Sequence, residues 1–199
     1  RVVEVAQRYV AEAEGPSGGG MGSRFGYQDL TSFRALYLVA SEATSFVREL
    51  SSESVRQWTP IILRKPALVD DEAEPYAELL HLVWHKAPDL VAEKISQAID
   101  EQNVETDRER PLLDMQLQTC WSEEIERMLF AKLRTCALKP GFAAYLLDVL
   151  LAKGSTQTEQ WAVQFLSGTL PDQQQEQERQ LQMALGLLFI EGDVWFTVW

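Results

Sequence analysis

The chain is poor in the residues that build disulfide frameworks and metal centres. Its 199 residues include two cysteines and two histidines. The cysteines, Cys120 and Cys136, lie within or beside one expected helix, too far apart along its axis to form a disulfide bond. Both are therefore predicted to be reduced and partly buried, as in a cytoplasmic protein.

Long apolar runs and positive charge are scarce as well. The longest apolar stretches, such as residues 185–190, are far shorter than the roughly 20 residues that a transmembrane helix needs. A net charge of −12, from 30 acidic and 18 basic residues, repels nucleic acid and anionic membrane surfaces. We therefore expect neither of them as a partner.

The sequence also lacks a complete catalytic motif. The glycine-rich run 15–22 follows a helical pattern and contains no lysine, so it predicts a flexible loop rather than a phosphate-binding loop. Neither histidine accompanies a Gly-x-Ser-x-Gly nucleophile motif. The acidic clusters at 70–74 and 122–126 lie where helices are expected to begin, and the helix dipole explains them. We expect no catalytic residue, no cofactor and no metal site.

What the sequence does contain is apolar residues at helical spacing, without sustained strand-like alternation. This pattern predicts an all-α fold of about nine or ten helices. Three parts are expected: an N-terminal helix at 1–14, the flexible loop at 15–26, and a helical repeat domain at 27–199. The repeat domain is predicted to be truncated, because residues 192–199 end in apolar and aromatic side chains without a polar cap.

Turn signals separate the expected helices, and Pro88 with Asp89 is predicted to form one such turn. The segment 54–63 contains Pro60 and is predicted to be short or kinked. Residues 142–153 are apolar almost all round and are predicted to be buried on more than one side. A loop or frayed end is expected over 101–110. The other predicted helices are one capped by Asp29 or Thr31, a partner capped by Thr44 and Ser45, and those at 76–86, 90–102, 112–119, 122–138, 155–166 and 173–190.

A helix-turn-helix pattern occurs more than once. Leu36, Leu38, Val39, Ala43, Phe46, Val47 and Glu49 recur 44 positions later as Leu80, Leu82, Val83, Ala87, Leu90, Val91 and Glu93. At an offset of 67 positions, Leu79, Leu80, Lys86, Ile95 and Ile99 recur as Leu146, Leu147, Lys153, Ala162 and Leu166. The unequal offsets argue against a regular tetratricopeptide array. They favour an irregular α-solenoid of stacked antiparallel helix pairs, of the HEAT or armadillo type.

His81 and His85 lie one helical turn apart, the spacing at which two imidazoles can share a zinc ion. Position 82 is leucine rather than the glutamate of a zinc protease, and no third ligand is evident. We interpret the two histidines, with Trp84 and Trp121, as candidates for an interaction surface. The six tryptophans as a group are better explained by core packing.

Three segments resemble the helical repeat region of large bacterial NACHT-type signalling ATPases. They are Met128-Leu129-Phe130-Ala131-Lys132-Leu133-Arg134 with Ala137-Leu138-Lys139-Pro140-Gly141-Phe142, then Leu146-Leu147-Asp148-Val149-Leu150-Leu151, and then Asp193-Val194-Trp195-Phe196-Thr197-Val198-Trp199. The resemblance covers the chain mainly from Gly26 onward. It implies an irregular solenoid that serves as a sensor or scaffold arm of a nucleotide-driven switch, whose ATPase residues have no counterpart here.

Three functional hypotheses follow. The first is a non-enzymatic, cytoplasmic scaffold segment that contacts a protein partner or other domains of its own chain. The second is a small helical enzyme or metal-binding module centred on His81 and His85. The third is an adaptor that binds nucleic acid through the basic cluster of Arg56, Arg64 and Lys65.

Overall fold

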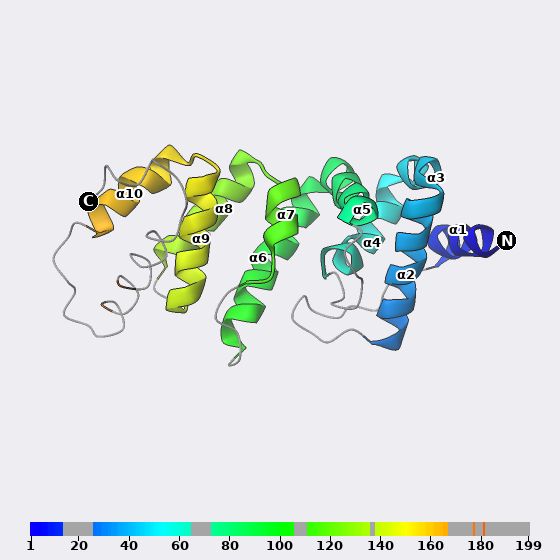
Figure 1. The fold of residues 1–199 in the computed structure, drawn as a ribbon, viewed down its shortest axis with the longest axis horizontal. Helices are drawn as coiled ribbons and strands as arrows, with labels where there is room; N and C mark the ends of the chain where they lie inside the picture. The colour runs from blue at the N-terminus through cyan, green and yellow to red at the C-terminus, as the bar shows by residue number, and fades with distance from the viewer. Residues whose placement is uncertain are drawn as a thin grey trace. The chain divides into compact units, whose positions relative to one another are not determined.

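The computed structural model describes residues 1–13, 26–64, 73–105, 111–135 and 138–166, together with 177 and 181. Every regular element in these ranges is a helix, which confirms the predicted all-α fold class (Figure 1). The ten helices are α1 (Val2–Glu12), α2 (Tyr27–Glu42), α3 (Thr44–Glu49), α4 (Ser52–Arg64), α5 (Ala73–Lys86), α6 (Pro88–Val104), α7 (Asp114–Thr119), α8 (Glu123–Arg134), α9 (Pro140–Ala152) and α10 (Thr156–Leu166). The chain divides into two compact units, one formed by 1–101 with 113–120 and the other by 102–112 with 121–199.

The core of the first unit lies among α2, α4 and α5, which pack against one another (Figure 1). Each of these helices buries one face, because its apolar residues recur every three or four positions. The side chains that are at most 1% exposed include Phe33, Leu36 and Val39 from α2, Trp58, Ile61 and Ile62 from α4, and Tyr76, Leu79, Leu80 and Val83 from α5. The rings of Phe33 and Tyr76 have centroids 6.1 Å apart and join α2 to α5.

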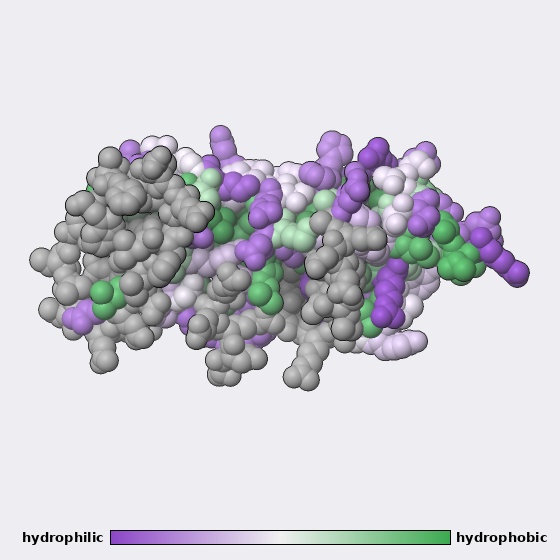
Figure 2. All heavy atoms as spheres, viewed as in Figure 1, coloured by the Kyte–Doolittle hydropathy of each residue, from purple (hydrophilic) through white to green (hydrophobic). Residues whose placement is uncertain are grey.

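Helix α1 packs against α2 and is also anchored to α4. The Trp58 indole Nε1 donates a hydrogen bond of 3.1 Å to the carbonyl oxygen of Val10, which lies in the last turn of α1 and has no partner within the helix. The hydroxyls of Tyr9 and Ser32 are 2.7 Å apart and link α1 to α2. The exposed side of α1 mixes apolar and charged residues (Figure 2): Val2 and Val5 are 73% and 66% exposed, and Glu4 and Arg8 are exposed as well.

The 44-residue sequence repeat corresponds to two helix junctions of the same form. Helices α2 and α3 are joined by Ala43 alone, and α5 and α6 are joined by Ala87 alone. The Ala43 N–H donates to the Val39 carbonyl at 2.9 Å, and the Ala87 N–H donates to the Val83 carbonyl at 2.8 Å. Each alanine carbonyl then accepts from the residue four positions on, at 3.4 Å from Val47 and 3.0 Å from Val91. The repeated residues therefore specify the same one-residue turn twice.

Burial follows the repeat at most positions but not at all of them, since Leu38 and Ala43 are half-buried whereas Leu82 and Ala87 are buried. Leu36, Val39 and Val47 are buried, and so are their counterparts Leu80, Val83 and Val91. Glu49 and Glu93 are both exposed. Because equivalent positions share their environment, the two segments are structural copies at these positions rather than a coincidence of composition.

The sequence repeat at the 67-residue offset is matched less completely in the structure. Its leucine pairs, Leu79 with Leu80 and Leu146 with Leu147, are all fully buried. The turn differs, because α9 and α10 are joined by three residues including Gly154, whose φ of +76° suits glycine. The helices correspond here, whereas the connection between them does not.

Several helix boundaries differ from those predicted at prolines. Helix α4 was predicted to be short or kinked; it is not short, since its 13 residues continue through Pro60, and the kink stays a prediction. Pro88 begins α6 instead of forming a turn, because the fixed φ of proline suits the first position of a helix. Helix α6 then continues to Val104, into the segment 101–110 for which a loop or a frayed end was predicted.

The predicted caps at the start of α2 and α3 were also wrong. Gly26 caps α2, and its N–H donates to the Asp29 carboxylate at 3.3 Å. Thr44 does not cap the start of α3, since its hydroxyl donates instead to the Ala40 carbonyl in the last turn of α2, at 2.9 Å. Polar residues near a boundary indicated that helices begin there, but not which residue forms the cap.

In the second unit, α9 packs against both α8 and α10. This arrangement confirms the prediction that the apolar segment 142–153 is buried on more than one side. The predicted start of α8 is correct as well, since the Ser122 hydroxyl accepts a hydrogen bond from the Ile125 N–H at 3.3 Å. Phe130 of α8 meets Trp161 of α10 edge to face, with centroids 6.1 Å apart. The predicted glycine-rich loop, Cys136, Trp195, Trp199 and the helix at 173–190 lie largely or wholly outside the described residues.

Candidate interaction surface

Helix α5 displays both histidines of the chain on its exposed side. His81 and His85 are exposed, whereas Leu82 and Val83 between them are buried. The four-residue spacing places the two imidazoles on one face, one turn apart. No hydrogen bond or ion pair of either imidazole occurs within the described part of the chain.

The two histidines line the same groove, which we call the α3–α5 groove. It has a volume of about 190 Å³ and is lined by Val47, Arg48, Glu78, His81, Leu82, His85 and Lys86. A wider hollow of about 940 Å³ shares Arg48 and Glu78 with it. Ala40, Ser41, Thr44, Glu74 and Pro75 complete the lining of this hollow. The surface between α3 and α5 is therefore concave on both sides of one charged pair.

That charged pair is the ion pair between Arg48 and Glu78. The Arg48 Nη2 lies 3.2 Å and 3.1 Å from the two carboxylate oxygens of Glu78. The side chains are 67% and 35% exposed, so water screens their attraction and the pair contributes little to stability. Its importance is positional, because it separates the histidine groove from the wider hollow.

Lys86 holds the end of α3 against α5. Its ammonium group donates hydrogen bonds to the carbonyl oxygens of Arg48, at 2.7 Å, and of Leu50. Carbonyls at the end of a helix have no partner within the helix, so a cation placed there satisfies them and faces the negative end of the dipole. Lys86 therefore fixes the wall of the groove that carries Arg48.

The structure brings together two of the four predicted surface residues. His81 and His85 share the groove, whereas Trp84 is half-buried on α5 and does not belong to the groove lining. Trp121 belongs to the second unit, where the Lys153 ammonium lies 5.4 Å from its ring centroid. Arg48, Glu78 and Lys86 also line the groove, and they were not among the predicted surface residues. Arg48 and Glu78 are 30 residues apart, and no local signal could have paired them.

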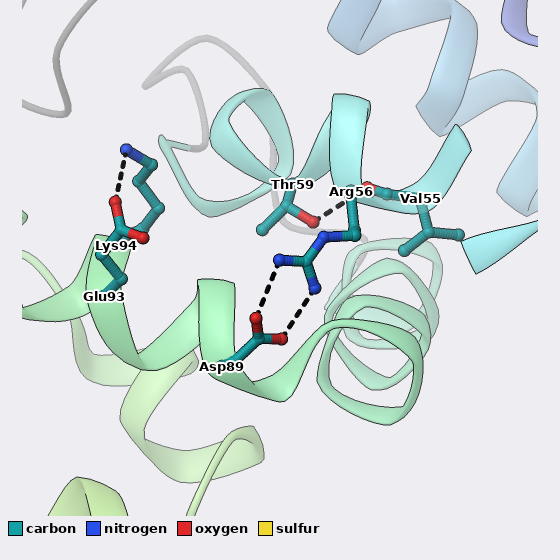
Figure 3. Close-up of polar contacts among 6 residues, drawn as sticks. All are labelled: Val55, Arg56, Thr59, Asp89, Glu93 and Lys94. Carbon is teal, nitrogen blue, oxygen red and sulfur yellow. Dashed lines mark hydrogen bonds and ion pairs between the residues drawn. The ribbon is translucent and has the colours of Figure 1, made fainter. Parts of the chain in front are cut away.

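The basic cluster that was considered for nucleic-acid binding comprises Arg56, Arg64 and Lys65. Within the described residues it does not form a free positive surface. Arg56 makes two hydrogen bonds of 2.8 Å to the two carboxylate oxygens of Asp89, in the first turn of α6 (Figure 3). The Arg64 side chain is only 3% exposed and lies 3.2 Å from the Asp29 carboxylate. Lys65 lies outside the described residues. Both arginines therefore serve to connect helices.

The contact with Arg56 changes the acidity of Asp89. The hydrogen bond from the guanidinium is the largest influence, and it lowers the pKa of Asp89 from 3.8 to about 2. The N–H groups at the start of α6 act in the same direction, because they favour the charged carboxylate. Asp89 is therefore negatively charged throughout the ordinary pH range.

A buried polar cluster joins α7 to α4 and α5. The Gln116 amide donates to the Leu63 carbonyl at 2.7 Å and lies 3.1 Å from the Tyr76 hydroxyl. Nearby, the Cys120 thiol lies 3.8 Å from the Leu80 carbonyl. Burial raises the pKa of Tyr76 and raises that of Cys120 to about 12, so both groups stay protonated at neutral pH. We assign this cluster a role in packing, because a protonated thiol is neither a strong nucleophile nor a metal ligand.

Three further findings bear on the chemistry of the chain. No group of three or more His, Cys, Asp and Glu side chains within the described ranges is placed to hold a metal ion. None of the helices in these ranges is long and apolar enough to cross a membrane. Comparison with protein families, curated proteins and solved structures found no match to this chain.

Proposed function

We propose that this chain is a non-enzymatic α-solenoid segment that makes protein–protein contacts within a large, cytoplasmic, bacterial NACHT-type signalling ATPase. The observation that carries the proposal is the duplicated helix pair, α2–Ala43–α3 and α5–Ala87–α6. Units of this kind bury their apolar faces by stacking on neighbours, and the stacked array offers a long surface for partners. The resemblance of segments 128–142 and 146–151 to the repeats of such ATPases supports the assignment.

The α3–α5 groove is the surface that we propose for the contact. It combines exposed donors on Arg48, His81 and His85 with apolar wall residues Val47 and Leu82. Such a mixture is typical of protein interfaces, in which arginine is enriched. The partner is either another domain of the same chain or a separate protein.

The flanking sequence of the full gene tests the family assignment. A phosphate-binding loop, written Gly-x-x-x-x-Gly-Lys-Ser/Thr between a strand and a helix, is expected upstream. A parent protein without any nucleotide-binding domain would contradict the assignment, and so would ATP hydrolysis by the purified chain alone.

The contact itself is tested by binding between the purified chain and the neighbouring nucleotide-binding domain. Arg48→Ala should weaken this binding about tenfold or more, because an arginine at the centre of an interface often contributes strongly to affinity. Arg127→Ala is the matched control, because Arg127 is also exposed but lies on α8 in the second unit. Equal binding by both variants would remove the groove from the proposal.

A further inference from the structure

The two histidines have the arrangement of a bidentate metal ligand. They occupy one face of α5 at positions four residues apart, both are exposed, and both line the α3–α5 groove. Side chains at this spacing on a helix have Cβ atoms about 6 Å apart, which allows two imidazoles to reach one ion. Because neither ring is held by a hydrogen bond within the described part of the chain, both can rotate toward a shared ion.

From this geometry we propose that His81 and His85 form a surface site for a single transition-metal dication, with Zn²⁺ as the probe. Imidazole nitrogen is a good ligand for Zn²⁺, Cu²⁺ and Ni²⁺ and a poor one for Mg²⁺ or Ca²⁺. The class of metal follows from the ligands themselves. The site uses the same two histidines as the proposed protein contact, but it needs no partner, so zinc binding by the chain alone can fail while the protein contact still holds.

The neighbouring charges limit how tightly the ion is held. Arg48 from α3 and Lys86 from α5 are cations on the groove wall, and they disfavour a second cation nearby. Glu78 is the nearest acid on the same helix, but Arg48 occupies both of its carboxylate oxygens. No third protein ligand joins the histidines among the described residues. Water therefore completes the coordination, and we expect affinity in the micromolar range, far weaker than that of a structural zinc site.

The internal repeat shows that the pair is not a general feature of this helix type. At the 44-residue offset, His81 corresponds to Tyr37 and His85 corresponds to Ser41. The core positions Leu36 and Val39 are kept as Leu80 and Val83. The packing of α5 thus requires no histidine at either position, and the pair is specific to the second copy.

Titration of the purified full chain with ZnCl₂, followed by calorimetry, tests the proposal at neutral pH. We expect one site per chain, and His81→Ala or His85→Ala should each weaken it roughly a hundredfold, because the second ligand acts at high effective concentration. Both replaced residues are exposed, so the variants are expected to fold, which circular dichroism checks.

A matched variant separates chelation from the simple presence of two histidines. His85→Ala combined with Gln160→His keeps the number of histidines at two but places the second on α10, at an exposed position. This variant should bind no more tightly than His85→Ala alone. No zinc binding by the unmodified chain would overturn the proposal. Zinc affinity that is unchanged by either alanine substitution, or that is restored by Gln160→His, would do so as well.

Discussion

At the scale of single residues, several charged side chains join one helix to another. Arg56 connects α4 to the start of α6, Lys86 connects α5 to the end of α3, and Arg64 connects α4 to α2. Their partners lie 33, 38 and 35 residues away, respectively. The sequence shows these residues as charges on helices, but not which helices they join.

The ion pair between Arg56 and Asp89 gives a prediction about stability at low pH. Because the folded state lowers the pKa of Asp89 from 3.8 to about 2, the contribution of this pair to stability is present above pH 4 and is lost as the pH falls toward 2. NMR titration of the Asp89 carboxyl should show a midpoint near 2. Arg56→Ala should return the midpoint toward 3.8, because it removes the main cause of the shift.

Arg127→Ala serves as the control for that titration, since Arg127 is exposed in the other unit. It should leave the Asp89 midpoint unchanged. A midpoint near 4 in the unmodified chain would mean that the bidentate contact is not formed in solution.

At the scale of helices and turns, the positions of the helices could be predicted from the sequence, but their exact boundaries could not. Apolar periodicity predicted the helices around Leu36, Val83 and Ile125, because burying one face of a helix requires that spacing. The one-residue turn at Ala87 was not predicted, and Pro88 was assigned to a turn. Proline disrupts a helix interior but suits its first turn, so its effect depends on a boundary that periodicity does not locate to the residue.

The two alanine junctions provide a matched pair of variants. Ala87 is fully buried at its junction, whereas Ala43 is only half-buried. Ala87→Leu is expected to overpack the turn and to lower the free energy of unfolding by about 1–3 kcal/mol. Ala43→Leu should cost less than about 1 kcal/mol, since its side chain can extend toward solvent. Equilibrium denaturation in urea, followed by tryptophan fluorescence, measures both.

A larger loss in the free energy of unfolding for Ala43→Leu than for Ala87→Leu would contradict the finding that Ala87 is the more buried of the two alanines. Equal losses would mean that the two turns are more alike than their side-chain environments indicate. The comparison is informative because both variants introduce the same side chain into the same type of turn.

The candidate surface was only partly predictable. Periodicity placed His81 and His85 on one helix face, and the groove between α3 and α5 indeed includes both. The groove also depends on Arg48, brought there by the fold of α3, and on Lys86, whose contacts with the end of α3 hold it in place. These are long-range contacts, so no pattern along α5 alone could have revealed them.

At the scale of the whole molecule, the protein is acidic, its described part is helical, and it divides into two units. The charge of −12 favours solubility and disfavours contact with anionic surfaces. The duplicated pair in the first unit, and the partial copy that includes α9 and α10, are the basis for proposing a stacked array. In such an array each helix pair contacts mainly its neighbours, so each added pair makes the array longer rather than thicker.

Small-angle X-ray scattering of the purified chain tests this central claim most directly, because it measures the radius of gyration in solution. A compact globular protein of 199 residues has a radius of gyration of about 16 Å. The solenoid account predicts a clearly larger value, with a bell-shaped Kratky plot that shows a folded chain and a cross-section two helices thick. A radius of gyration near 16 Å, with a symmetric distance distribution, would contradict it.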